Sequence, residues 1–175
     1  DKLDLIGDIS KDYYTWIEYG LQTIHNKTLE KVNRGETFET FLKSYEATKK
    51  RGINVCVHVI LGMWETHEEM MQTAQKLAEL GVDGVKIHML CALENTKLAQ
   101  MYANKEIDFM SEDEYINTVC DFLEYLPQNT TIHRLAGNGL KKELIAPRWI
   151  GKKLDCLNKI DKELLRRNSY QGSKF

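Results

Sequence analysis

The chain has 175 residues, of which 42% are hydrophobic, and a formal net charge of -2 at pH 7. This size and composition predict one compact domain with an ordinary core. The sequence has no apolar run near the roughly 20 residues needed to cross a bilayer and no signal peptide, so we expect a soluble, cytoplasmic protein with no membrane partner.

Basic residues gather near the C-terminus, although the overall charge is not the positive one typical of nucleic-acid-binding proteins. A solvated helix face has the same pattern, so nucleic-acid contact stays uncertain. The basic residues are Lys152, Lys153, Lys159, Lys162, Arg166 and Arg167.

The cysteines lie far apart, without a Cys-x-x-Cys pair or a Cys/His quartet. Such spacing is typical of reduced thiols, so we expect no metal site in this chain. The four are Cys56, Cys91, Cys120 and Cys156.

The first third of the chain alternates helix and strand. Apolar residues at helical spacing open the chain over residues 3–9, and residues 16–22 form a predicted strand. A short helix then ends at Asn-Arg-Gly, 33–35, and a longer one covers 36–51 and stops at Gly52, where a left-handed cap fits.

The same rhythm continues to the C-terminus. Two capping boxes, Thr66 with Glu69 and Ser111 with Glu114, mark helix starts. The predicted strands are 53–61, 82–90 and 130–135, and the predicted helices are 66–80, 96–102, 111–126 and 149–167.

Strands that alternate with helices predict an α/β fold with parallel pairing and helical crossovers. Near-continuous apolar strands such as 55–61 are typical of a sheet buried on both faces.

Polar residues share one face of three strands. Side chains alternate along a strand, so Glu18 and Gln22, then His58, then Lys86 and His88 lie opposite apolar residues. If helices cover the apolar faces, these five side chains converge on a concave interior, where α/β barrels bind ligands.

Structural roles explain some of these residues equally well. His58 could be a hydrogen-bonded core residue. Lys86 needs an anion, a carboxylate or a wet cavity, and Glu18 could be only its ion-pair partner. Arg34 could cap helix carbonyls or reach a carboxylate with its planar fork.

Several motifs together resemble the radical S-adenosylmethionine (SAM) enzymes of the elongator-like branch, and in particular a group of uncharacterised bacterial proteins. The likeness covers essentially the whole chain. The motifs are Glu-x-Gly-Leu-Gln-Thr at 18–23, Asn-Arg-Gly at 33–35, His58 before Gly62, Val-Lys-Ile at 85–87, Glu-Asn-Thr-x-Leu at 94–98, Ile-His-Arg at 132–134, Leu-Ile-Ala-Pro at 144–147 and Tyr-Gln-Gly at 170–172.

The resemblance implies a partial β/α barrel, of which this chain is roughly the C-terminal half, starting in the helix before the fourth strand. We expect residues 1–135 to complete that half-barrel and 136–175 to form a helical extension of the same unit. The family's Cys-x3-Cys-x2-Cys loop, which holds a 4Fe-4S cluster, follows the first strand. No cysteine here has that spacing, so we expect no cluster in this chain.

The resemblance also implies roles for the polar residues. Gln22, Arg34 and His58 match family positions near the SAM ribose and methionine groups, and Glu18 matches an acidic position on the same strand. Lys86 matches a lysine of the elongator-like branch and, with His88, would face the substrate.

Two features depart from the family. After Gly62 the group usually continues Leu-Pro-Gly-Glu-Thr, whereas this chain has Met-Trp-Glu-Thr at 63–66, which puts backbone contacts to adenine in doubt. The chain also ends at Phe175 without the acetyltransferase domain of elongator proteins, so we do not assume their transfer-RNA substrate for it.

We therefore expect the C-terminal part of a radical SAM enzyme with an unknown substrate, inactive as this fragment alone. The alternative is a non-catalytic α/β module that binds SAM, a nucleotide or a partner protein. A phosphate-handling barrel is a weaker third interpretation, because no Gly-rich loop opens a helix.

A half-barrel would leave its first strand with an unpaired edge. In the whole protein, the preceding half-barrel would be the partner of that edge. The isolated chain would pair with another copy or cover the edge with a terminal helix.

Overall fold

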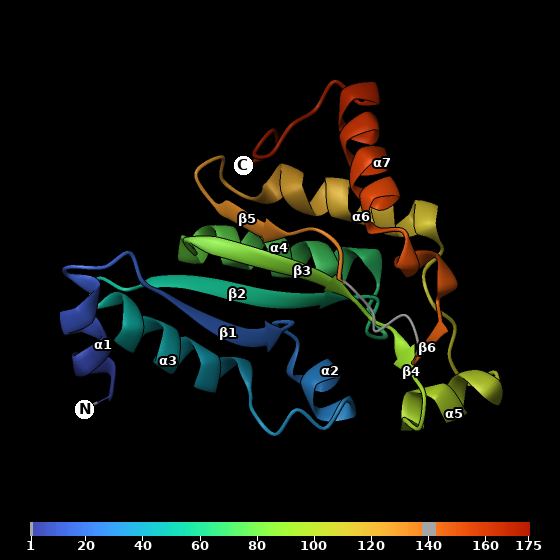
Figure 1. The fold of residues 1–175 in the computed structure, drawn as a ribbon, viewed down its shortest axis with the longest axis horizontal. Helices are drawn as coiled ribbons and strands as arrows, with labels where there is room; N and C mark the ends of the chain where they lie inside the picture. The colour runs from blue at the N-terminus through green and yellow to red at the C-terminus, as the bar shows by residue number, and fades with distance from the viewer. Residues whose placement is uncertain (1, 138–142) are drawn as a thin grey trace.

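A computed structural model describes residues 2–137 and 143–175. Four parallel strands form the main sheet in the order β1-β2-β3-β5, and two short strands form a separate antiparallel pair, β4-β6 (Figure 1). The strands are β1 (Trp16–Gln22), β2 (Asn54–Leu61), β3 (Gly84–Met89), β4 (Ala92–Leu93), β5 (Thr131–Arg134) and β6 (Leu144–Ala146).

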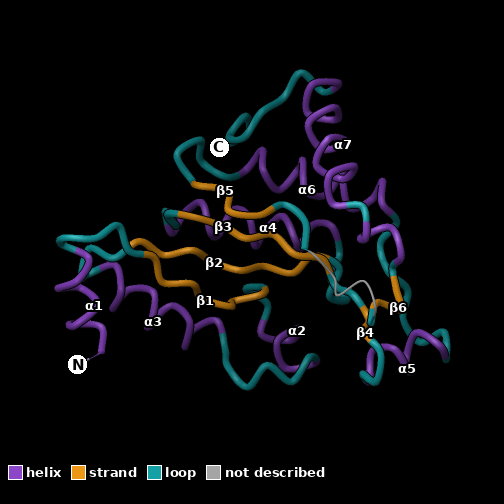
Figure 2. The backbone as a smooth tube through the Cα atoms, viewed as in Figure 1, coloured by secondary structure: helices purple, strands orange, loops and turns teal. Residues whose placement is uncertain are grey.

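Helices connect successive strands of the sheet, so the α/β fold with parallel strands and outer helices is confirmed (Figure 2). They are α1 (Lys2–Ser10), α2 (Asn26–Lys31), α3 (Phe38–Lys49), α4 (His67–Leu80), α5 (Lys97–Ala103), α6 (Glu112–Tyr125), the 3-10 helix η1 (Arg148–Gly151) and α7 (Lys153–Arg166).

The core lies between the sheet and helices α3, α4 and α6. Val57 and Ile87 are fully buried there, from the apolar faces of β2 and β3, against Tyr45 of α3, Leu77 of α4 and Phe122 of α6. Burying such side chains is the main stabilising contribution to the fold. The predicted apolar faces are therefore the helix-covered ones, which leaves the opposite face of the sheet for the polar residues.

Cap residues fix several helix boundaries. The side chains of Thr66 and Ser111 each accept a hydrogen bond from the backbone N–H three residues on, and both capping boxes are complete. Gly81 ends α4 in the left-handed conformation, at φ 65°, and Gly52 follows α3 at φ 71°. Each of these signals was readable in the sequence.

Two parts of the predicted element order need correction. The predicted helix 149–167 is divided into η1 and α7, because Lys152 between them has φ -110° and ψ 59°, outside the helical region. The β4–β6 pair was not predicted, since strands of two and three residues are too short to show a period of two.

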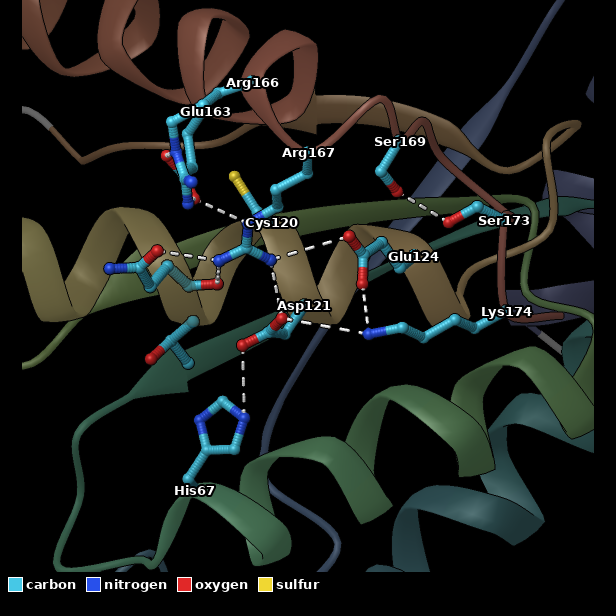
Figure 3. Close-up of polar contacts among 12 residues, drawn as sticks. His67, Cys120, Asp121, Glu124, Glu163, Arg166, Arg167, Ser169, Ser173 and Lys174 are labelled. Atoms are coloured by element: carbon cyan, nitrogen blue, oxygen red, sulfur yellow. Dashed lines mark hydrogen bonds and ion pairs between the residues drawn. The ribbon is translucent and has the colours of Figure 1, made fainter.

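The C-terminal segment is anchored to α6 (Figure 3). The Arg167 guanidinium donates to Asp121 Oδ1 and Glu163 Oε1, both at 2.7 Å, and Lys174 pairs with Glu124. Beyond α7, Gln171 Nε2 donates to the carbonyls of Pro127 and Thr130. These contacts hold the tail against the end of α6 and the loop that leads to β5.

Among the residues that the structure describes, three of the six clustered basic residues form ion pairs. Lys159 pairs with Glu112, and Arg166 pairs with Glu163, as does Arg167. Nucleic-acid contact at this surface stays a prediction.

None of the helices in the described ranges is both long and apolar enough to span a membrane. The proposed division at residue 135 also stays a prediction.

Candidate functional site

The open face of the sheet brings three charged or polar side chains together. Glu18 on β1 lies beside His58 on β2 and Lys86 on β3. Its Oε2 is 2.9 Å from His58 Nε2, and its Oε1 accepts a hydrogen bond from Lys86 Nζ. Parallel pairing explains this, because His58 and Lys86 are register partners.

Glu18 is held ionised at this position. The hydrogen bond from Lys86 has the largest effect and lowers the pKa of the Glu18 carboxyl. Burial opposes it, and the hydrogen bond with His58 lowers the pKa further. Glu18 is 42% exposed and Lys86 only 18%, so the carboxylate supplies the counter-ion for a largely covered ammonium group. The ion pair between Lys86 and Glu18 that the sequence suggested is therefore present, and the Glu18 side chain stays partly exposed.

His88 lies next to His58 on the same face. The two rings stack with centroids 5.6 Å apart and an interplanar angle of 29°. Burial lowers the His88 pKa to about 4, and the positive charges of Arg134 and Lys86 act in the same direction. His88 is therefore a neutral imidazole at pH 7.

Gln22 and Arg34 meet over Gly20. The Arg34 guanidinium donates to the Gly20 carbonyl at 2.9 and 3.2 Å. A Cβ on Gly20 would lie 2.7 Å from Gln22 Nε2 and 3.5 Å from an Arg34 nitrogen, so the absent side chain makes room for both. Arg34 therefore reaches from the turn after α2 back to β1.

The strand does not keep strict alternation as far as Gln22. The pairing of β1 with β2 shifts register between Tyr19 and Gln22, and Gln22 has φ 76°. Its amide nevertheless lies on the Gly20 side, as expected.

Aromatic rings fill the other end of this face. The Trp16 and His133 rings meet edge to face at 4.5 Å, and a Cβ on Gly84 would lie within 3 Å of both. The polar residues therefore stand toward the carboxyl ends of the strands, where barrels bind ligands.

The loop after β2 keeps an unusual backbone despite its departure from the family pattern. When the Glu-Thr of the family pattern Leu-Pro-Gly-Glu-Thr is aligned with Glu65 and Thr66, the glycine of the pattern falls on Trp64. Trp64 has φ 52°, a conformation that glycine adopts easily. Lys31 Nζ lies 4.7 Å from the centre of the Trp64 ring. Trp64 and Glu65 line a cavity of about 600 Å³ with the start of α4 and α6.

The cysteines are protonated thiols. Burial raises the pKa of Cys56, Cys120 and Cys156 to about 11 in each case and also raises that of Cys91. Within residues 2–137 and 143–175, no three His, Cys, Asp or Glu side chains are grouped so that they could hold a metal ion.

Sequence reasoning assigned no role to Arg134, which pairs in register with Lys86. Arg134 is the last residue of the Ile-His-Arg motif at 132–134, which is readable in the sequence. Its strand, however, has four residues and a register shift beside Lys86, so alternation could not give its face.

Comparison with known families identifies the chain. The profile of the Radical SAM superfamily matches residues 1–77, and that of the Radical_SAM C-terminal domain matches residues 82–166. This chain belongs to the radical SAM superfamily.

Two uncharacterized proteins are similar to this chain along its whole length. The chain is 38% identical to the uncharacterized protein YtqA of Bacillus subtilis and 39% identical to the uncharacterized protein MJ0486 of Methanocaldococcus jannaschii. Each alignment covers 100% of this chain and 55% of the relative, so the chain spans about half the length of these two relatives.

The fold is shared with a solved archaeal protein. The structure of Elp3 from Methanocaldococcus infernus with its N-terminus deleted superimposes with a TM-score of 0.76 and 21% identity, over 95% of this chain and 39% of that one. This likeness shows that the two proteins share a fold.

Proposed function

We propose that this chain is the C-terminal part of a radical SAM enzyme and forms one wall of its SAM site. Gln22, Arg34, His58 and Glu18 would hold the cofactor, and Lys86 and His88 would face the substrate. The observation that carries the proposal is the set of polar groups that converges from β1, β2 and β3 on the open face of the sheet.

The donor set suits SAM. Arg34 keeps guanidinium nitrogens within reach of the space over Gly20, and such a planar fork can pair with a methionine carboxylate. The Gln22 amide can donate to and accept from ribose hydroxyls, and Glu18 can accept from them with its remaining lone pairs.

The described residues do not suit an iron–sulfur cluster. A cluster needs thiolates at close spacing, whereas the four cysteines are separated and protonated. We therefore infer that the cluster is held by a part of the whole protein outside this chain.

With SAM and a reduced 4Fe-4S cluster bound, the whole protein would have available the radical chemistry that removes a hydrogen atom from a substrate. This chain's residues would orient and shield that chemistry. Glu18 fixes the His58 ring, since a carboxylate only accepts and His58 Nε2 must then carry the proton. His88 would be neutral there, and the charges of Glu18 and Lys86 offset one another.

The upstream reading frame gives the first test. A Cys-x3-Cys-x2-Cys within about one half-barrel of residues before Asp1 is required, and its absence would end the enzyme proposal. The second test is reconstitution of the whole protein with iron and sulfide. We expect 5′-deoxyadenosine from SAM under reducing conditions.

Substitutions in the proposed wall of the SAM site make this second test more specific. Arg34→Gln should weaken SAM binding about tenfold or more, the loss expected for a charge-assisted hydrogen bond. The exposed Lys11→Gln, on a residue outside the wall, serves as the control. Saturable SAM binding without any 5′-deoxyadenosine would favour the non-catalytic binding module instead.

We also propose that β1 pairs with a preceding strand of the same protein. Within the described residues, β1 has a strand neighbour on one side only, and Tyr13 and Tyr14 beside it are exposed. Hydrogen exchange can test this. Amides of β1 should be more protected in the whole protein than in the isolated chain, which we expect to self-associate.

A further inference from the structure

A second cavity lies beside the candidate site, where β3 and β5 end. Its volume is about 210 Å³, and its walls come from these strand ends, η1, α6 and α7. His88 belongs both to this cavity and to the polar face, because its ring stacks on His58. The cavity is therefore continuous with the residues proposed to face the substrate.

His88 presents an unpartnered polar atom. Its Nε2 is buried, and among the described residues no donor or acceptor reaches it. Leaving such an atom unpaired costs free energy that a hydrogen-bonding ligand would recover. His88 lines the cavity, and an unpaired buried polar atom in a folded protein calls for an explanation such as a missing partner.

Arg134 supplies positive charge to the same cavity. No hydrogen bond or ion pair joins its side chain to any residue in 2–137 or 143–175. The nearby carboxylate of Glu18 is already engaged by Lys86 and His58. Arg134 is only partly exposed, and a guanidinium in that setting favours an anion with oxygens for its planar fork.

The remaining wall is apolar. Tyr115 donates its hydroxyl to the Leu135 carbonyl, and Trp149 donates its indole N–H to the Met110 carbonyl, so both present ring surfaces to the cavity. The Cys156 thiol is neutral. The volume lies below the roughly 300–1,000 Å³ of pockets that enclose a whole drug-sized ligand, so the cavity suits one group of a larger molecule.

We propose that Arg134 and His88 form a subsite for an oxyanion, a carboxylate or a phosphate, carried by a small apolar group. Arg134 pairs with the anion and His88 Nε2 donates a hydrogen bond to it, while the aromatic rings contact the apolar part. Its use as a substrate subsite rests on the proposed function, whereas binding of the anion does not.

The test is calorimetric titration of the full-length protein with benzoate, phenyl phosphate and uncharged benzamide. At least one anion should bind with a Kd on the order of 1 mM, and about tenfold more tightly than benzamide. The tighter anion identifies the oxyanion. Equal binding of all three, or no binding by either anion, overturns the proposal.

Matched variants locate the binding. Arg134→Gln should weaken anion binding about tenfold, whereas Arg148→Gln, at an exposed arginine in η1 that does not line the cavity, should leave it unchanged. Equal effects of the two variants contradict the assignment. Because a variant can misfold, the wild-type Trp149 indole NMR signal provides a second measurement. It should shift with the anion, and an unmoved signal at saturation counts against the site.

The outcomes separate the two proposals. If the protein binds the anion but does not cleave SAM, the subsite proposal stands and the enzyme proposal fails. If the protein cleaves SAM but does not bind the anion, the enzyme proposal stands and the subsite proposal fails.

Discussion

Glu18 Oε2 and His58 Nε2 lie 2.9 Å apart, although 40 residues separate them in the chain. The contact joins two adjacent parallel strands, and Lys86 on the third strand bonds to the other carboxylate oxygen. One acidic residue therefore organises the polar face of three strands.

Glu18→Gln should lower the stability of the fold modestly. The change leaves the Lys86 ammonium, 18% exposed, without its counter-ion, and we expect a loss of about 1 kcal/mol because solvent still reaches position 18. Urea unfolding of both proteins measures it. Glu36→Gln is the control, since Glu36 forms a longer, more exposed pair with Arg34, and it should unfold like the wild type. Equal stability of all three proteins would contradict the prediction.

The same carboxylate predicts a pH dependence in acid. Its pKa is lower in the folded than in the unfolded state, so the stabilisation is complete above the ordinary value of 4.5 and is lost as pH falls through the folded pKa. Glu18→Gln should flatten this part of the stability–pH curve. A variant curve parallel to that of the wild type below pH 4.5 would argue against a lowered pKa.

His88 predicts a second pH dependence, in a higher range. Its folded pKa is about 4 against an ordinary 6.5, so the unfolded state binds the proton more readily between these values. Stability should therefore fall as pH drops from 6.5 toward 4, by a few kcal/mol at most, and His88→Gln should remove that fall. An NMR titration of the ring checks the pKa directly, and an ordinary value near 6.5 would be inconsistent with a buried imidazole.

The faces of the long central strands could be predicted from the sequence. Over 55–61 the odd positions are Val, Val, Val and Leu, and burial of those side chains under α3, α4 and α6 fixes which face holds His58. A slip by one residue would expose the whole apolar set, so alternation determines the register strongly. This is why Glu18, His58, Lys86 and His88 were placed together correctly.

Short or irregular segments could not be predicted in this way. The φ of Gln22 is 76°, and the face of Arg134 depends on a register shift, which is a property of strand pairing rather than of local sequence. The break at Lys152 falls inside a run whose apolar spacing fits one continuous helix. Tertiary contacts decide each of these cases.

Two glycines on the open face should differ sharply when changed to alanine. Gly84→Ala places a Cβ within 3 Å of the Trp16 and His133 rings, which are large and constrained, and should cost about 1–3 kcal/mol. Gly20→Ala meets only the end of the flexible Gln22 side chain and should cost less. Thermal unfolding compares them, and the reverse order of stability would contradict this packing. In the whole protein, Gly20→Ala should still weaken SAM binding, because it displaces the Gln22 amide.

Adjacent arginines at the end of α7 give the last prediction. Both bind Glu163, but Arg167 is 19% exposed and also bonds to Asp121 and Asn117, whereas Arg166 is 72% exposed. Arg167→Ala leaves the partly buried carboxylates of Asp121 and Glu124 on α6 with fewer positive partners and should destabilise the fold by about 2–3 kcal/mol. Arg166→Ala, the matched control, should change stability little. Chemical denaturation distinguishes them, and hydrogen exchange should show loosening of the tail beyond 167 in the first variant alone. Equal loss in both variants would mean that Glu163, rather than the buried Arg167 network, holds the C-terminal segment in place.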